Sequence, residues 1–167
     1  MAHSRTAAEH VTLSGRMGRG MLAGLVAGAA FALITMWFVT STDAPARSPF
    51  LLISTIVLGE NAIDTGEATV LIGVLVHAGL SALFGMAFGL VTPRLRTNGT
   101  VAVAGLGYGL FLYLLNLQLL APLYFHEFQE YANQPFEVLV HLLYGGLVGL
   151  GFYSSDVRRQ EPFLSIG

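Results

Sequence analysis

Four long apolar stretches alternate with polar connections along the chain. They cover residues 20–42, 68–93 and 97–125, and a fourth that runs from about residue 135 to 155 and contains Glu137 and His141. A helix needs about 20 apolar residues to cross the hydrocarbon core of a membrane. The pattern therefore predicts an all-α, polytopic membrane protein with four transmembrane helices.

Two prolines indicate where helices begin and end. Residues 48–59 are apolar but too few to cross a membrane. Because Pro49 after Ser48 is typical of a helix start, we expect a short helix here. It would lie at the membrane interface in the first outer connection or dip in and return, and a loop packed on the bundle is the alternative. Pro122 marks a stop for the third helix, which we expect to span residues 100–121.

The composition indicates that lipid surrounds the helices. Only 11% of the 167 residues are charged, against about 25% in soluble domains, and the mean hydropathy is +0.66. The 20 glycines would weaken soluble helices but allow close contact between membrane helices. There is no cysteine, which excludes disulfides and thiolate metal sites. A net charge of −2 argues against binding to nucleic acid.

The arginines predict the orientation in the membrane. Seven of the eight lie on one side of the predicted helices, and only Arg47 lies on the other. Because cytoplasmic connections carry the excess of basic residues, both termini should be cytoplasmic. We expect a single transmembrane domain over residues 1–167, with polar tails at 1–14 and 156–167. The seven are Arg5, Arg16, Arg19, Arg94, Arg96, Arg158 and Arg159.

The chain contains signs of an internal duplication. Val-Leu-Val-His occurs at 74–77 and again at 138–141, so a shift of 64 positions overlays the second helix on the fourth. A shift of 81 positions overlays the first helix on the third, placing Gly24 on Gly105 and Gly28 on Gly109. These shifts predict a two-plus-two pseudo-repeat about an axis along the membrane normal. His77 and His141 would then lie at one depth.

Glycine spacing predicts which helix faces pack together. Each predicted helix has two glycines four positions apart, which is the spacing of close contacts between membrane helices. The histidines share a helix face with these glycines and should therefore point into the bundle. The eight glycines are Gly24, Gly28, Gly85, Gly89, Gly105, Gly109, Gly145 and Gly149.

Polar side chains near the histidines form a hypothetical relay. Glu137 lies four positions before His141, so its carboxylate and the imidazole share a face. Ser81 and Tyr144 provide hydroxyl groups. Asn116, and likewise Gln118, is expected to make an interhelical hydrogen bond.

The histidines admit three roles. They could fix helix packing through hydrogen bonds. They could bind a cofactor, such as a haem b held axially by His77 and His141, or a metal ion held together with Glu137. They could also take part in ion or proton transport, with Glu137 and Asn116 as part of a polar track from the acidic outer side. No nucleophile paired with a base and no phosphate-binding loop is apparent, so we expect no enzymatic activity.

Short motifs resemble those of the YagU-like group of small bacterial inner-membrane proteins. They are Ala-Gly-Leu-Val-Ala-Gly from Ala23, His77 with Ser81, and Glu137 with His141 followed by two arginines at 158–159. The string from His141 to Gly149 is also similar to other uncharacterised four-helix bacterial proteins. The resemblance implies a bacterial plasma membrane and four helices.

These observations together favour a small non-enzymatic membrane protein. We expect an accessory or structural subunit that associates with itself or with a larger membrane complex, in contact with the lipid bilayer. The alternative is a protein that handles a ligand, haem, an ion or a proton through its intramembrane histidines.

Overall fold

The computed structural model describes residues 13–153, and its regular elements are all helical, as the sequence predicts. Residues 1–12 and 154–167, which include Arg5, Arg158, Arg159 and most of both predicted tails, lie outside this range. The elements are α1 (Leu13–Ser41), α2 (Ser48–Leu58), the 3-10 turn η1 (Glu60–Ala62), α3 (Val70–Val91), the 3-10 turn η2 (Thr92–Arg94), α4 (Asn98–Tyr113), the π-helix η3 (Leu114–Leu120), α5 (Ala121–Tyr124), α6 (His126–Tyr131) and α7 (Gln134–Leu150).

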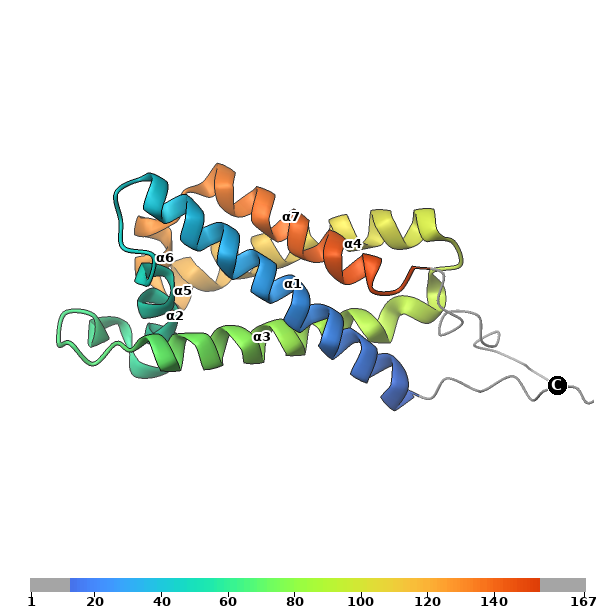
Figure 1. Cartoon of the computed structure of the whole chain (residues 1–167), viewed down its shortest axis with the longest axis horizontal. Helices are drawn as coiled ribbons and strands as arrows, with labels where there is room; N and C mark the ends of the chain where they lie inside the picture. The colour runs from blue at the N-terminus through green and yellow to red at the C-terminus, as the bar shows by residue number, and fades with distance from the viewer. Residues whose placement is uncertain (1–12, 154–167) are drawn as a thin grey trace, which may run out of the picture.

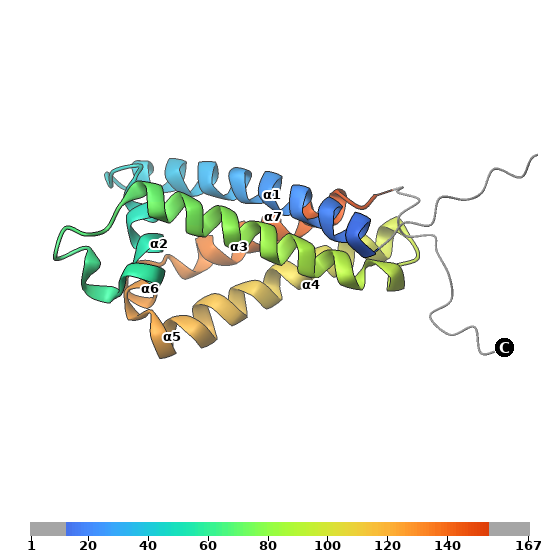
Figure 2. The same cartoon turned by 90° about the horizontal axis from the view of Figure 1, so that it is seen from below.

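The long helices run along one axis in alternating directions (Figures 1 and 2). α1 packs mainly on α3, and α4 packs mainly on α7. Contacts between α1 and α7 join these two pairs. α2 lies across one end of the bundle, steeply inclined to the long helices (Figure 1). The start of α1, the end of α7 and the connection between α3 and α4 lie at the opposite end.

Three helical segments of the described chain are long and apolar enough to cross a membrane. They are Leu13–Ser41 with 29 residues, Val70–Arg94 with 25 and Asn98–Tyr124 with 27. The fourth predicted span forms α7, which has only 17 residues and a length of about 25 Å at 1.5 Å per residue. The structure therefore supports a multi-pass membrane protein with three candidate spans. α7 is at the lower limit of the length of a spanning helix and is not one of the three.

The apolar segment after α1 forms a helix rather than a loop. α2 begins at Ser48 with Pro49 in its first turn, as the sequence predicts. Its buried hydroxyls need internal partners, because helix α2 packs against α3. Ser54 Oγ donates to the Leu51 carbonyl and Thr55 Oγ1 to the Leu52 carbonyl, both at 2.7 Å.

Pro122 does not end the third long helix, which corrects the prediction. The helix widens to π geometry over Leu114–Leu120 and continues as α5 to Tyr124. In a π-helix the N–H of residue 122 would donate to the Leu117 carbonyl, but proline has no N–H. Gln129 Nε2 donates to this carbonyl instead, at 2.6 Å. The freed acceptor is thus satisfied from α6, and the helix can continue.

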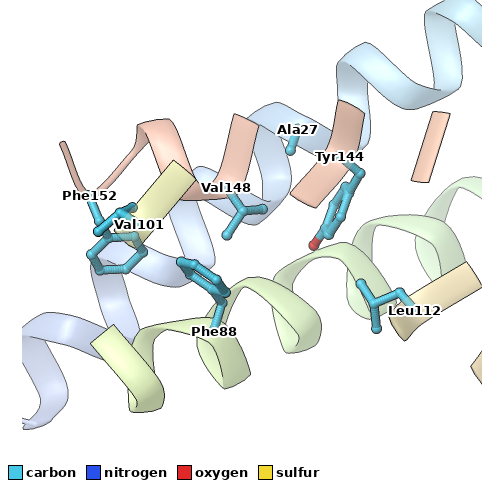
Figure 3. Close-up of a cluster of buried hydrophobic side chains, with 7 residues drawn as sticks. All are labelled: Ala27, Phe88, Val101, Leu112, Tyr144, Val148 and Phe152. Atoms are coloured by element: carbon cyan, nitrogen blue, oxygen red, sulfur yellow. The ribbon is translucent and has the colours of Figure 1, made fainter. Parts of the chain in front are cut away.

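The buried hydrophobic cluster joins all four long helices toward the end where α7 terminates (Figure 3). The Phe88 and Phe152 rings have centroids 5.8 Å apart, and Phe88 lies 5.3 Å from the Tyr108 ring. Such offset ring contacts add to the packing of an apolar interior. The cluster consists of Ala27, Phe88, Val101, Leu112, Tyr144, Val148 and Phe152.

Candidate functional site

The glycines of α1 and α3 bring the two backbones into direct contact. A Cβ at Gly24 would overlap the Ser81 carbonyl oxygen and approach Gly85 Cα at 2.9 Å. A Cβ at Gly28 would overlap the Ser81 side chain, and one at Gly89 would lie 2.7 Å from the Arg16 carbonyl oxygen. Only residues without a side chain fit at these positions.

α4 and α7 make the same kind of contact. A Cβ at Gly105 would lie 2.6 Å from the Gly145 carbonyl oxygen and 3.4 Å from Gly149 Cα. A Cβ at Gly109 would overlap the His141 carbonyl oxygen. All eight glycines named from their spacing therefore lie at a helix–helix contact, four in each pair.

The His77 imidazole is anchored to the main chain of α1. Its Nε2 lies 2.9 Å from the Gly28 carbonyl oxygen. A carbonyl only accepts hydrogen bonds, so Nε2–H donates. The ring also contacts Phe31 and Phe50, with centroids 5.8 and 6.2 Å away. Ser81 and its hydroxyl lie on the same face, against Gly28.

His141 is buried, with 6% of its surface exposed, and is paired with Glu137. Its Nδ1 donates to the main-chain carbonyl of Glu137 at 2.7 Å, and the Glu137 carboxylate lies 3.6 Å from the same nitrogen. Both contacts follow from the four-residue spacing on α7. The carboxylate and the imidazole predicted to meet do so.

The Phe31 ring contacts both histidines. Its centroid lies 5.8 Å from that of His77 and 5.1 Å from that of His141. The two imidazoles are thus neighbours across one benzene ring. Each is bonded to a main-chain carbonyl.

This arrangement does not fit a haem between the histidines. The glycine faces that would make room for the macrocycle are filled by backbone contacts within each helix pair. His77 Nε2 is engaged with Gly28, and Phe31 occupies the position beside both rings. No group of three or more potential metal ligands occurs within residues 13–153.

The Tyr144 hydroxyl, predicted near the histidines, bonds to the main chain of α3 instead. Tyr144 Oη, from α7, donates to the Ser81 carbonyl at 2.7 Å. Tyr108 Oη, from α4, donates to the Phe84 carbonyl of the same helix at 2.8 Å. The two tyrosines tie both helices of the second pair to α3 by bonds between helices.

Asn116 does not make the predicted interhelical hydrogen bond. Its side chain is half-buried, and no bond from it to another residue is seen within 13–153. Gln118, for which the same kind of bond is expected from the sequence, does make it, in a cluster with Tyr113 and Gln134 that the sequence does not predict. Gln118 Nε2 donates to Tyr113 Oη and Gln134 Oε1, and Tyr113 Oη also donates to Gln134 Oε1, all at 2.8–2.9 Å. The Tyr113 ring is 5.9 Å from His141.

The acidic outer connections come together around α6. Glu60 accepts hydrogen bonds from the His126 main-chain N–H at 3.0 Å and from its ring at 2.9 Å. These bonds lower the pKa of Glu60 below its ordinary 4.5. Desolvation, with repulsion from Asp64, Glu60 and Glu130, raises the pKa of Glu127. Of these two neighbouring carboxyls, Glu127 therefore takes up a proton at higher pH than Glu60.

Comparisons with protein-family models, curated proteins and solved structures find no match. The resemblance to the YagU-like group therefore rests on the short motifs alone. What the fold and the comparisons together establish is a small, mostly helical protein with three long apolar helices.

Proposed function

We propose that the chain is a four-span, non-enzymatic protein of the bacterial plasma membrane that acts as a subunit of a membrane assembly. α7 is the fourth span, because it runs antiparallel to α4 and beside it (Figure 2). Both termini are cytoplasmic, because one end of the bundle holds the start of α1 and the connection between α3 and α4 (Figure 1), and these segments contain Arg16, Arg19, Arg94 and Arg96. Arg47 follows α1, which ends at the opposite end. α2 then lies at the outer interface.

The contacts within the two helix pairs support the pseudo-repeat. The shifts of 81 and 64 positions turn the contact of Gly24 with Ser81 and Gly85 into a contact of Gly105 with Gly145 and Gly149. The second contact is present in the structure beside the first. One packing register in both pairs is what a pseudo-repeat predicts.

The internal bonds of the histidines favour a packing role. Each imidazole donates to a carbonyl within the bundle and contacts Phe31, which links α1 to both α3 and α7. The His77 bond joins α3 to α1, and a bond of this kind between membrane helices contributes about 0.6–2 kcal/mol. The His141 bond stays within α7.

One observation carries the proposal of an assembly. The half-buried Asn116 amide, in a helix that crosses the hydrocarbon core, has no hydrogen bond to the rest of the described chain. A polar group without a partner in hydrocarbon costs several kcal/mol. Gly79 and Gly107 give further support, because no atom outside their own helices lies within 4 Å of a Cβ at either position. Neighbouring membrane helices from other subunits would satisfy the amide and pack on these glycines.

The test is the assembly state after gentle extraction in native lipid discs. We expect the wild type as an oligomer or in a complex with another membrane protein, and Asn116→Val mostly as a free monomer. Asn61→Val is the matched control, because Asn61 lies in an exposed outer connection where water satisfies its amide. A wild-type protein that is monomeric and without a co-purifying membrane protein would refute the proposal.

A second candidate function is proton or ion handling. It is favoured by the Glu137 carboxylate, which lies in the bundle with His141 Nδ1 at 3.6 Å. Passive proton flux into proteoliposomes should then fall when Glu137→Gln or His141→Ala is introduced. Flux equal to that of the wild type in both variants would exclude this function.

A further inference from the structure

Two shallow hollows flank the inner half of α7. One lies between α4 and α7 and is lined by Leu106, Gly146 and Tyr153, among others. The other lies between α1 and α7 and is lined by Arg19, Leu22 and Val26, among others. Leu147 and Leu150 line both, so the hollows run along the two sides of one ridge.

We propose that this paired surface binds one anionic phospholipid, with one acyl chain in each hollow and the phosphate at Arg19. The proposal goes beyond the assembly function and does not depend on it. Residues 142–150, which line the first hollow, cover about 12 Å of helix. Half of the hydrocarbon core is about 15 Å thick, so the hollows match the depth of one leaflet.

Arg19 is held at the end of the hollows. Its Nε donates to the Gly151 carbonyl at 2.6 Å, and its guanidinium carbon lies 5.9 Å from the Phe152 ring centroid. A guanidinium has five N–H donors, and one is used here. Within residues 13–153 no other hydrogen bond of this side chain is seen. A guanidinium fixed in place, with donors to spare, suits a phosphate.

Charge favours a lipid over a second copy of the chain on this surface. Arg16, Arg19, Arg94 and Arg96 lie at the inner end of the bundle, whereas the acids of the described chain all belong to the outer connections or to the start of α7. A second copy side by side in the same orientation would bring further arginines toward Arg19. An anionic headgroup at the membrane surface provides the opposite charge.

The test measures lipid retained by the full chain in native mass spectrometry, with phosphatidylglycerol or phosphatidylcholine supplied in detergent. We expect one phosphatidylglycerol per chain, retained about tenfold better than phosphatidylcholine. Arg19→Gln should abolish this preference, and Arg96→Gln, which removes an arginine at the same end, should leave it unchanged. Equal retention of the two lipids, or an unchanged preference in Arg19→Gln, would overturn the proposal.

Two further measurements distinguish binding of the acyl chains from binding of the headgroup. Gly146→Leu fills the hollow between α4 and α7, because a Cβ there already reaches Leu106 at 3.5 Å. It should lower phosphatidylglycerol retention several-fold while the melting temperature without lipid stays the same. Glycerol phosphate, which has an anionic phosphate but no acyl chains, should not displace the lipid at equal concentration. Displacement by glycerol phosphate would show a phosphate site without acyl-chain binding and overturn the proposal. Disulfides between copies that carry Leu22→Cys would also overturn it, because they would place a second copy of the chain on this surface.

Discussion

Two glycines of α1 stand in opposite surroundings. Gly24 touches the backbone of α3, whereas no atom outside its own helix lies within 4 Å of a Cβ at Gly18. We expect Gly24→Ala to lower the free energy of unfolding by about 1–3 kcal/mol, because the new methyl group meets rigid backbone. Reversible unfolding in detergent or bicelles, followed by circular dichroism, would measure the change.

Gly18→Ala is the matched control in the same helix. It adds the same methyl group in open space and should raise stability by up to about 1 kcal/mol through the better helix propensity of alanine. If both substitutions had the same effect, the backbone contact between α1 and α3 at Gly24 would be wrong.

Tyr144 provides a second test at the level of one atom. Its hydroxyl donates to the Ser81 carbonyl at a buried position, so Tyr144→Phe removes one bond between α7 and α3. We expect a loss of about 0.6–2 kcal/mol in the free energy of unfolding. Tyr124→Phe should change it little, because the Tyr124 side chain is 63% exposed. Equal losses in the same unfolding assay would show that the hydroxyl bond adds nothing.

Among elements, the π-helix depends on a side chain that lies outside it, on α6. Gln129→Leu leaves the Leu117 carbonyl without a donor and should cost about 1 kcal/mol or more. In a Pro122→Ala background the new N–H can donate to the freed carbonyl, so the same substitution should cost much less. A double-mutant cycle on unfolding free energies would measure this coupling. Additive effects would mean that Gln129 does not replace the missing proline N–H.

The contact between Glu60 and α6 should respond to pH. Because the His126 bonds lower the pKa of Glu60, its carboxylate stabilises the outer connections above pH 4.5. This stabilisation is lost as the pH falls through the lowered pKa. The mobility of a spin label at Glu130→Cys on α6 should therefore rise as the pH falls through the lowered pKa of Glu60.

Glu127 acts in the opposite sense. Its raised pKa means that it binds a proton more readily in the folded state, so its protonation relieves repulsion as the pH falls. Glu60→Gln isolates the Glu60 contribution and should give a mobile label at every pH. Asp43→Asn, in the same outer region, should leave the wild-type profile. A label whose mobility in Glu60→Gln still follows the wild-type curve would contradict the role of Glu60.

At the scale of the whole molecule, sequence patterns predicted what depends on spacing. The apolar stretches located the long helices, and glycines four apart located the backbone contacts, because helix periodicity alone determines which residues share a face. The Glu137–His141 pair followed from the same rule. Pro49 correctly predicted the start of α2.

Other features depend on how distant segments meet, and the sequence could not predict them. The effect of Pro122 was misjudged because its consequence depends on Gln129, which reaches Leu117 only after the chain has turned into α6. Asn116 and Gln118 are both expected to bond between helices, but only Gln118 does so in the described chain, and Tyr113 joins it at Gln134 of α7. The sequence does contain one signal for this cluster, because its polar residues lie close to the end of the third apolar stretch, near Pro122.

The last prediction concerns the orientation in the membrane. Because the sequence has no cysteine, each variant has one cysteine for the reagent to label. If α7 crosses the membrane, single cysteines in the connections should alternate in their access to a membrane-impermeant maleimide. In intact cells we expect the reagent to label Glu67→Cys and Tyr131→Cys. Thr97→Cys and a cysteine added to the carboxyl end should be labelled only after permeabilisation. Tyr131 and the added cysteine flank α7, so this pair decides whether 17 residues suffice. If both cysteines were labelled in intact cells, α7 would not cross the membrane and the chain would have three spans. Labelling of the added cysteine only after permeabilisation would mean that α7 crosses, with the bilayer thinned or the helix extended past Leu150 to match the hydrocarbon core.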